Sequence, residues 1–94
     1  MKKELLFITV LGQDKKGIVA RISQVLYACD VNIEDINQRI MDKYFVMVML
    51  VDMKDSRATL EDITERLERI AKEMKLTVQL QHENIFKMMH RICT

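Results

Sequence analysis

Apolar and polar residues are distributed along the chain in four segments that predict strands. Residues 5–11 and 44–51 are apolar almost throughout, as expected of strands that are covered on both faces. Residues 31–41 and 76–82 mix apolar with polar residues, as expected of strands that are partly exposed. The pattern therefore predicts two inner strands and two outer strands.

Between the strands, apolar residues recur every three or four positions over residues 18–29 and 60–74, which predicts two amphipathic helices. We expect Asp14 to be the N-cap of the first helix and Asp55 or Ser56 that of the second. Short polar side chains at these positions accept hydrogen bonds from the free amides of a first helical turn.

The polarity of the strands predicts their places in a sheet. Apolar strands belong in the centre and mixed strands at the edges, and two right-handed crossovers put both helices on one face. With Asp42 and Lys43 as a two-residue turn between the second and third strands, the order 4-1-3-2 satisfies these conditions. We therefore predict an α+β, ferredoxin-like βαββαβ fold: a four-stranded antiparallel sheet with two helices on one face.

The third predicted strand is apolar on both of its faces. The two sets are Tyr44, Val46, Val48 and Leu50 on one face and Phe45, Met47, Met49 and Val51 on the other. Two helices cover one set only, and soluble monomers rarely expose an apolar patch of that size. We expect a second protomer, the C-terminal tail, or both to cover the other set. The tail itself, through Ile85, Met88, Met89 and Ile92, predicts a short C-terminal helix.

Length, charge and cysteine content narrow the class of protein. The 94 residues suit one domain, with a core over about 4–83 and a tail over 84–94. Fifteen basic residues balance 14 acidic ones, no basic block stands out, and no apolar stretch could span a bilayer, so neither nucleic acid nor membrane is an expected partner. Cys29 and Cys93 match no metal spacing, which favours a reduced, cytoplasmic protein.

The segment from Gly12 to Gly17 joins the first strand to the first helix and is the strongest candidate for a binding loop. Free amides at a helix N-terminus attract anions, and Gly17 lets a ligand approach the backbone. Lys15 and Lys16 add positive charge, while Asp14 could accept from an ammonium group, so a ligand with a carboxylate, best an amino acid, would suit the loop. The alternative is a tight turn with a capped helix that binds nothing.

Other segments offer less chemistry. Asn32 presents a donor and an acceptor, or simply begins an edge strand. His82, Glu83 and His90 suggest a metal site, but their spacing matches no known metal motif, and a strand-end histidine with a second on the tail is the simpler interpretation. No nucleophile has a partner base, so we predict neither catalytic residues nor a cofactor.

Two features of the sequence resemble the ACT domain family. The first is the βαββαβ order, with its loop and strand-start motifs Gly12-x-Asp14-x-x-Gly17-Ile18 and Asn32-Ile33. The second is a pair of segments, YFVMVMLVD at 44–52 and QHENIFKMMHRI at 81–92, which resembles stand-alone, single-domain ACT proteins of uncharacterised role.

The resemblance implies a regulatory module that binds a small molecule, usually an amino acid, and forms a homodimer or higher oligomer. It also implies a regulated enzyme or other protein as a possible partner. Ligands of this family usually lie between the loop after the first strand of one protomer and the start of the second strand of its neighbour. The matching residues are Asp14, Gly17, Ile18, Asn32 and Ile33. Two alternatives stay open: a protein-interaction module without a ligand, and a metal-binding protein that uses the tail.

Overall fold

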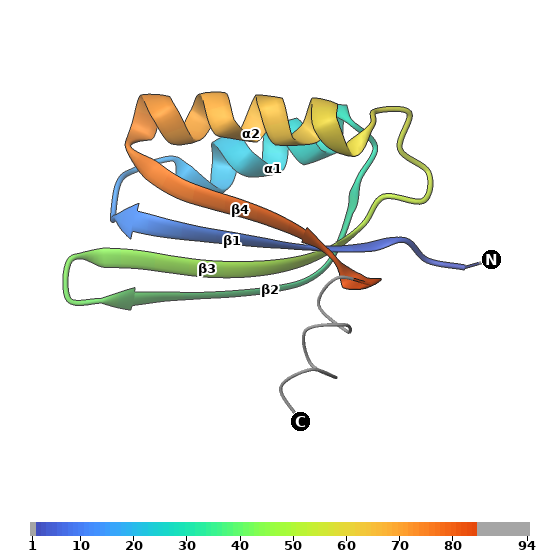
Figure 1. Ribbon diagram of the computed structural model, residues 1–94. Helices are drawn as coiled ribbons and strands as arrows, with labels where there is room; N and C mark the ends of the chain where they lie inside the picture. The colour runs from blue at the N-terminus through green and yellow to red at the C-terminus, as the bar shows by residue number, and fades with distance from the viewer. Residues whose placement is uncertain (1, 85–94) are drawn as a thin grey trace.

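The computed structural model describes residues 2–84 and has the predicted order of elements. These are β1 (Leu5–Gln13), α1 (Ile18–Ala28), β2 (Asn32–Met41), β3 (Tyr44–Asp52), α2 (Leu60–Met74) and β4 (Leu76–His82). The strands form one antiparallel sheet in the order β2-β3-β1-β4 (Figure 1), which confirms the predicted 4-1-3-2 arrangement.

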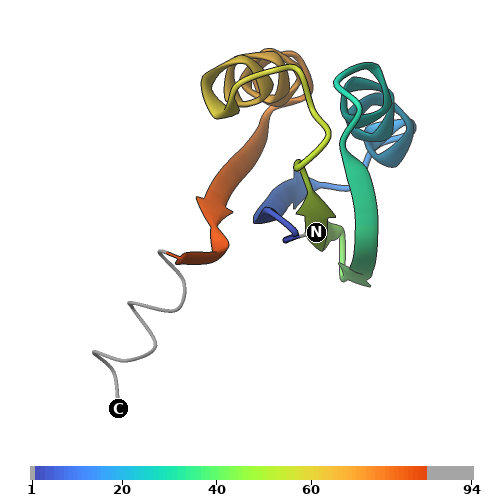
Figure 2. The same cartoon turned by 90° about the vertical axis from the view of Figure 1, so that its right-hand side faces the viewer.

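Both helices lie on the same face of the sheet, as Figures 1 and 2 show from two directions. The core lies between the helices and the two inner strands. Leu6, Ile8 and Val10 of β1 are completely buried there, and the predicted helix stripes meet them through residues such as Ile22 and Leu67. Burial of large apolar side chains, each contributing about 1.5–3 kcal/mol, is therefore concentrated in one layer.

The other face of the sheet is not covered by any helix or strand within residues 2–84. Phe45, Met47, Met49 and Val51 of β3 face the helices and are at most 3% exposed. On the opposite face Tyr44 is 45% and Val48 41% exposed. The prediction that the strands over 5–11 and 44–51 are covered on both faces is thus met on one face only within the described chain.

Three details of the connections differ from expectation or confirm it. The strand β1 continues through Gly12 to Gln13 instead of ending before Gly12. A Cβ atom at Gly12 would lie 2.6 Å from Cδ2 of Leu76 on β4 and 3.3 Å from the Cα atom of Leu76, so a larger residue would displace the Leu76 side chain. The predicted two-residue turn is confirmed: Met41 pairs with Tyr44, and Asp42 adopts the left-handed conformation with φ 58°.

The predicted N-caps are wrong for both helices. Asp14 lies three residues before the actual N-cap of α1, which is Gly17 and has no side-chain cap. The N-cap of α2 is Thr59. Asp55 and Ser56 belong to the preceding loop, where the Ser56 hydroxyl instead donates to the carbonyl oxygen of Cys29 at 2.6 Å.

The predicted C-terminal helix lies outside the described residues. No helix within residues 2–84 is long and apolar enough to cross a membrane.

Candidate functional site

The loop between β1 and α1 is held in place by two contacts with distant segments. The backbone N–H of Asp14 donates to the carbonyl oxygen of Lys43 in the β2–β3 turn at 2.9 Å. The Lys15 ammonium group donates to the carbonyl oxygen of Met74 at 2.7 Å, where it meets the negative end of α2. The charge of Lys15 is therefore directed to the C-terminus of α2. Of the two lysines in the loop, Lys16 is the one whose charge is not directed there.

The N-terminus of α1 is open. Gly17 has φ +89°, a left-handed conformation that glycine adopts without strain, and a Cβ atom added to it would meet nothing within 4 Å. No side chain caps the helix, and its first turn contains no acidic residue. Its first amides therefore keep their hydrogen-bonding capacity and their partial positive charge. Ile18, the next residue, is only 2% exposed and anchors the helix in the core.

Asn32 and Ile33 lie at the opposite end of the sheet from this loop. Asn32 pairs with Asp52, which in turn pairs with Leu5 at the start of β1, whereas Asp14 follows Gln13 at its end. The nine residues of β1 span roughly 26 Å at about 3.3 Å per residue. Within one chain, Asp14, Gly17 and Ile18 lie together in the loop after β1 and at the start of α1, and Asn32 and Ile33 lie at the other end of the sheet. Figure 1 shows that the β1–α1 loop and the start of β2 are at opposite ends of the sheet.

The start of β2 is organised by charged neighbours. The side-chain amide of Asn32 donates to Glu34, which also forms an ion pair with Lys3, and both contacts lower the pKa of Glu34. Asp52 is 5% exposed. Burial opposes its ionisation, but the backbone N–H groups of Glu4 and Lys54 and nearby lysine charges outweigh this effect and lower the pKa of Asp52. This end of the sheet is thus a satisfied polar cluster.

Comparison with known proteins places the chain in a family. The profile of the ACT domain matches residues 4–81. The chain belongs to the ACT domain family. It is 47% identical over 85 residues to a UPF0237 protein of Methanocaldococcus jannaschii, an alignment that covers 90% of this chain and 94% of that protein.

Solved structures agree with the fold of this ACT domain. An ACT domain protein from Streptococcus pneumoniae has a TM-score of 0.77 and 30% identity, with 90% of this chain and 96% of that chain covered. The regulatory subunit of aspartate kinase from Thermus thermophilus has a TM-score of 0.66 and 21% identity, with 85% of this chain and 52% of that chain covered. The second similarity supports the fold alone.

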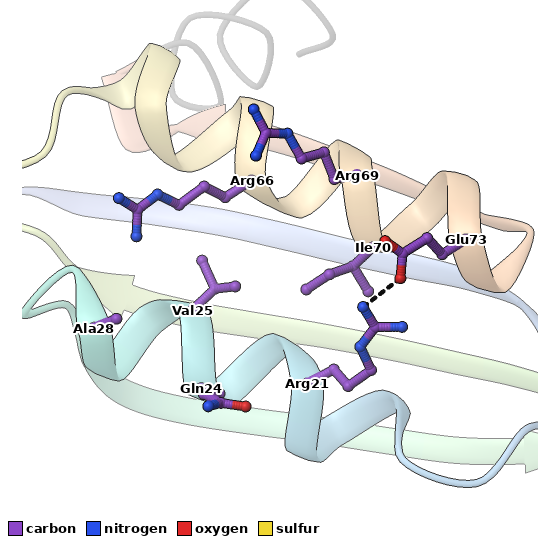
Figure 3. A pocket seen from close by; sticks show the side chains of 8 residues that line it. All are labelled: Arg21, Gln24, Val25, Ala28, Arg66, Arg69, Ile70 and Glu73. Atoms are coloured by element: carbon purple, nitrogen blue, oxygen red, sulfur yellow. Dashed lines mark hydrogen bonds and ion pairs between the residues drawn. The ribbon is translucent and has the colours of Figure 1, made fainter.

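A groove of about 350 Å³ lies between the two helices of the ACT domain (Figure 3). Arg21 of α1 reaches across it to Glu73 of α2 at 2.5 Å, while Arg69 forms an ion pair with Glu65 on its own helix at 2.9 Å. The side chains of both pairs are exposed to solvent, and exposed pairs of this kind contribute roughly 0–1 kcal/mol each to stability. We therefore interpret this groove as a solvated helix surface. The sequence does not indicate this groove, because its residues belong to two helices and meet only in the fold.

Only His82 and Glu83 of the hypothetical metal site lie within the described residues. The Nδ1 atom of His82 accepts a hydrogen bond from the backbone N–H of Asn84 at 3.1 Å. Within residues 2–84 no three His, Cys, Asp or Glu side chains are placed to hold a metal ion. His90 lies outside the described residues. Cys29, the C-cap residue of α1, is a buried free thiol.

Proposed function

We propose that this ACT domain is a cytoplasmic regulatory module that senses an amino acid and works as a homo-oligomer. The observation that carries the proposal is the open N-terminus of α1. A helix start that lacks a side-chain cap and a first-turn acid, beside a glycine with free space above it, suits a carboxylate ligand. Asp14, Gly17 and Ile18 form this part of the proposed site.

An amino acid suits the loop better than a simple anion. Asp14 is exposed and does not serve as a cap, so its carboxylate is available to an ammonium group. A simple anion would meet the same carboxylate as a like charge. A zwitterion could direct its carboxylate to the amides of α1 and its ammonium group to Asp14.

The second half of the proposed site must come from another protomer. Asn32 and Ile33 lie at the far end of the same sheet, so they could reach the loop only from a neighbour that runs in the opposite direction. Twofold symmetry, the commonest symmetry of homo-oligomers, supplies such a neighbour. Ile33, which is 36% exposed, would then contribute apolar contact beside the polar group of Asn32.

A regulatory role follows from the same site. A ligand held by two protomers stabilises one relative arrangement of them, which a bound enzyme or other protein could detect. The similar fold in the regulatory subunit of an aspartate kinase is consistent with this role.

The test is a calorimetric titration of the protein with each of the twenty amino acids, followed by thermal-shift measurements on any that bind. A specific ligand raises the melting temperature by mass action. Gly17→Asn is the informative variant. Asparagine tolerates the left-handed conformation but places a side chain in the free space over the helix amides. We expect lost binding with an unchanged circular dichroism spectrum, and retained binding would move the site elsewhere.

The alternative function is a protein-interaction module without a ligand. The exposed apolar residues of the uncovered sheet face favour it. The titration separates the two functions, because a pure interaction module would bind none of the amino acids while retaining its self-association.

A further inference from the structure

The uncovered face of the sheet has an ordered layout. Three rows of side chains run across the middle of this face, and the pairing of the strands gives the members of each row in the order β4, β1, β3, β2. The rows are Gln81, Phe7, Leu50, Asp35, then Gln79, Thr9, Val48, Asn37, then Thr77, Leu11, Val46, Arg39. The apolar residues come from the two central strands. Neutral polar side chains border them on β4, and Asp35, Asn37 and Arg39 border them on β2. An apolar centre with a polar rim is typical of a protein interface.

The face is hollowed as well as exposed. A groove of about 410 Å³ lies over β3 and β2 and is bordered by Phe7, Val48 and Leu50 together with the polar residues of β2. Leu11 is 47% exposed and Val48 41%. Both helices lie on the other side of the sheet from this surface (Figure 2).

We propose that this face binds the same face of a second copy, through a twofold axis that lies between the two sheets and runs across the strands. This arrangement stacks each strand on its own counterpart in the opposite direction, about 10 Å away. The row containing Val48 lies on the axis. The row containing Leu50 in one copy therefore lies opposite the row containing Val46 in the other copy. The inference refines the proposed self-association and does not rest on the proposed ligand.

Charge decides the direction of the axis. Asp35 and Arg39 are at opposite ends of the groove, and neither has an ionic partner in the described part of the chain. An axis across the strands puts each Asp35 opposite the partner's Arg39, twice per dimer. An axis along the strands would instead stack β2 on the neutral residues of β4 and leave both charges unpaired.

The apolar rows fit the same axis. Leu50 meets Val46 of the partner, Phe7 meets Leu11, and Val48 meets its own counterpart. Among residues 2–84, a second copy therefore supplies apolar contact and both opposite charges from residues already present. Another protein would have to reproduce this whole pattern independently.

The experiment compares two residues of equal exposure on opposite faces of the sheet. Val48 and Ile36 are each 41% exposed, and Ile36 pairs with Met49, which faces the helices. Light scattering coupled to size exclusion, over a dilution series of the full chain, should show a dimer or higher oligomer for wild type. Val48→Glu should break the face contact and reduce the mass, with unchanged helical content by circular dichroism. Ile36→Glu should leave the mass unchanged.

A charge exchange tests the pairing of Asp35 with Arg39. We expect Asp35→Arg and Arg39→Asp, each alone, to weaken association by about tenfold or more, because each places like charges opposite one another. An equimolar mixture of the two variants, and the double variant, should recover association. Recovery also shows that the single variants fold.

Several results would overturn the inference. If Val48→Glu keeps the wild-type mass, or Ile36→Glu alone lowers it, copies associate by another surface and the proposed homo-oligomer stands without this face. If wild type is monomeric, the face is covered by other residues of the chain or by another protein. Titration with amino acids on the same samples reports separately on the proposed ligand site.

Discussion

The two helices of this ACT domain begin in opposite ways. The helix α2 starts with a complete capping box: the Thr59 hydroxyl accepts from the N–H of Asp62 at 3.1 Å, and the Asp62 carboxylate accepts from the N–H of Thr59 at 3.2 Å. Its first turn also carries Glu61 and Asp62, which complement the helix dipole. The helix α1 starts at a left-handed glycine with no side-chain cap and no acid.

The difference indicates which helix start is free for an external group. The capping box of α2 satisfies the N–H groups of Thr59 and Asp62, and its first-turn acids offset the partial positive charge of the helix, so this start is less suited to an external anion. The start of α1 has neither a side-chain cap nor a first-turn acid, and the core anchors this helix through Ile18 and Ile22. Four substitutions test whether one start is built for stability and the other for binding.

The largest effect is expected at Gly17. A valine there must adopt φ +89°, and for a β-branched residue this conformation is a genuine outlier. We expect Gly17→Val to lower the free energy of unfolding by about 1–2 kcal/mol, since that is the usual penalty for an L-residue in the left-handed region. Urea denaturation measures it. A valine variant as stable as wild type would mean that the loop adopts another conformation.

The next effect is expected at Thr59. Removal of the hydroxyl leaves the N–H of Asp62 without its partner, so Thr59→Ala should lower the free energy of unfolding by about 1 kcal/mol. Thr64→Ala, the same chemical change inside the same helix, is the matched control and should be neutral or slightly stabilising. Equal losses from both variants would contradict the capping role of Thr59.

The hydrophobic pattern predicted the elements, and together with the right-handed crossover rule and the short turn at Asp42 and Lys43 it predicted the strand order. The pattern over residues 44–51 correctly indicated two apolar faces, but it could not say what covers the second one. The cap of α2 could have been found, since Thr59 and Asp62 have capping-box spacing. The role of Gly12 could not, because it depends on Leu76, which is distant in sequence.

The candidate site was predictable in part. The positions of Asp14 and Gly17 in one loop follow directly from the sequence. The separation of Asn32 from that loop follows from the antiparallel topology, since β2 starts beside the start of β1. The contact of Lys15 with Met74 was not predictable, because it depends on where α2 ends relative to the loop.

A smaller effect should come from placing an acid in the first turn of α1. Ala20 is exposed there, and Ala20→Glu would imitate the acidic first turn of α2. We expect this change to raise the free energy of unfolding by about 0.3–1 kcal/mol through the helix dipole. It should weaken the binding of any carboxylate ligand identified by titration, because the new charge repels it. Ala20→Gln, which lacks the charge, should do neither, and tighter binding by the Glu variant would exclude carboxylate recognition at this helix.

The smallest effect on stability is expected at Asp14, where the original expectation of a helix cap makes the opposite prediction. The cap of α1 is Gly17, so Asp14→Asn should change the free energy of unfolding by no more than about 0.5 kcal/mol. A loss of about 1 kcal/mol would instead show that the carboxylate contributes as a cap. If Asp14 receives the ammonium group of an amino acid, the variant should bind the free amino acid more weakly. It should bind the N-acetyl derivative no worse than wild type does, because that derivative has no ammonium group to recognise. Equal binding of the free amino acid by wild type and variant would leave the helix amides as the only polar contact in this loop.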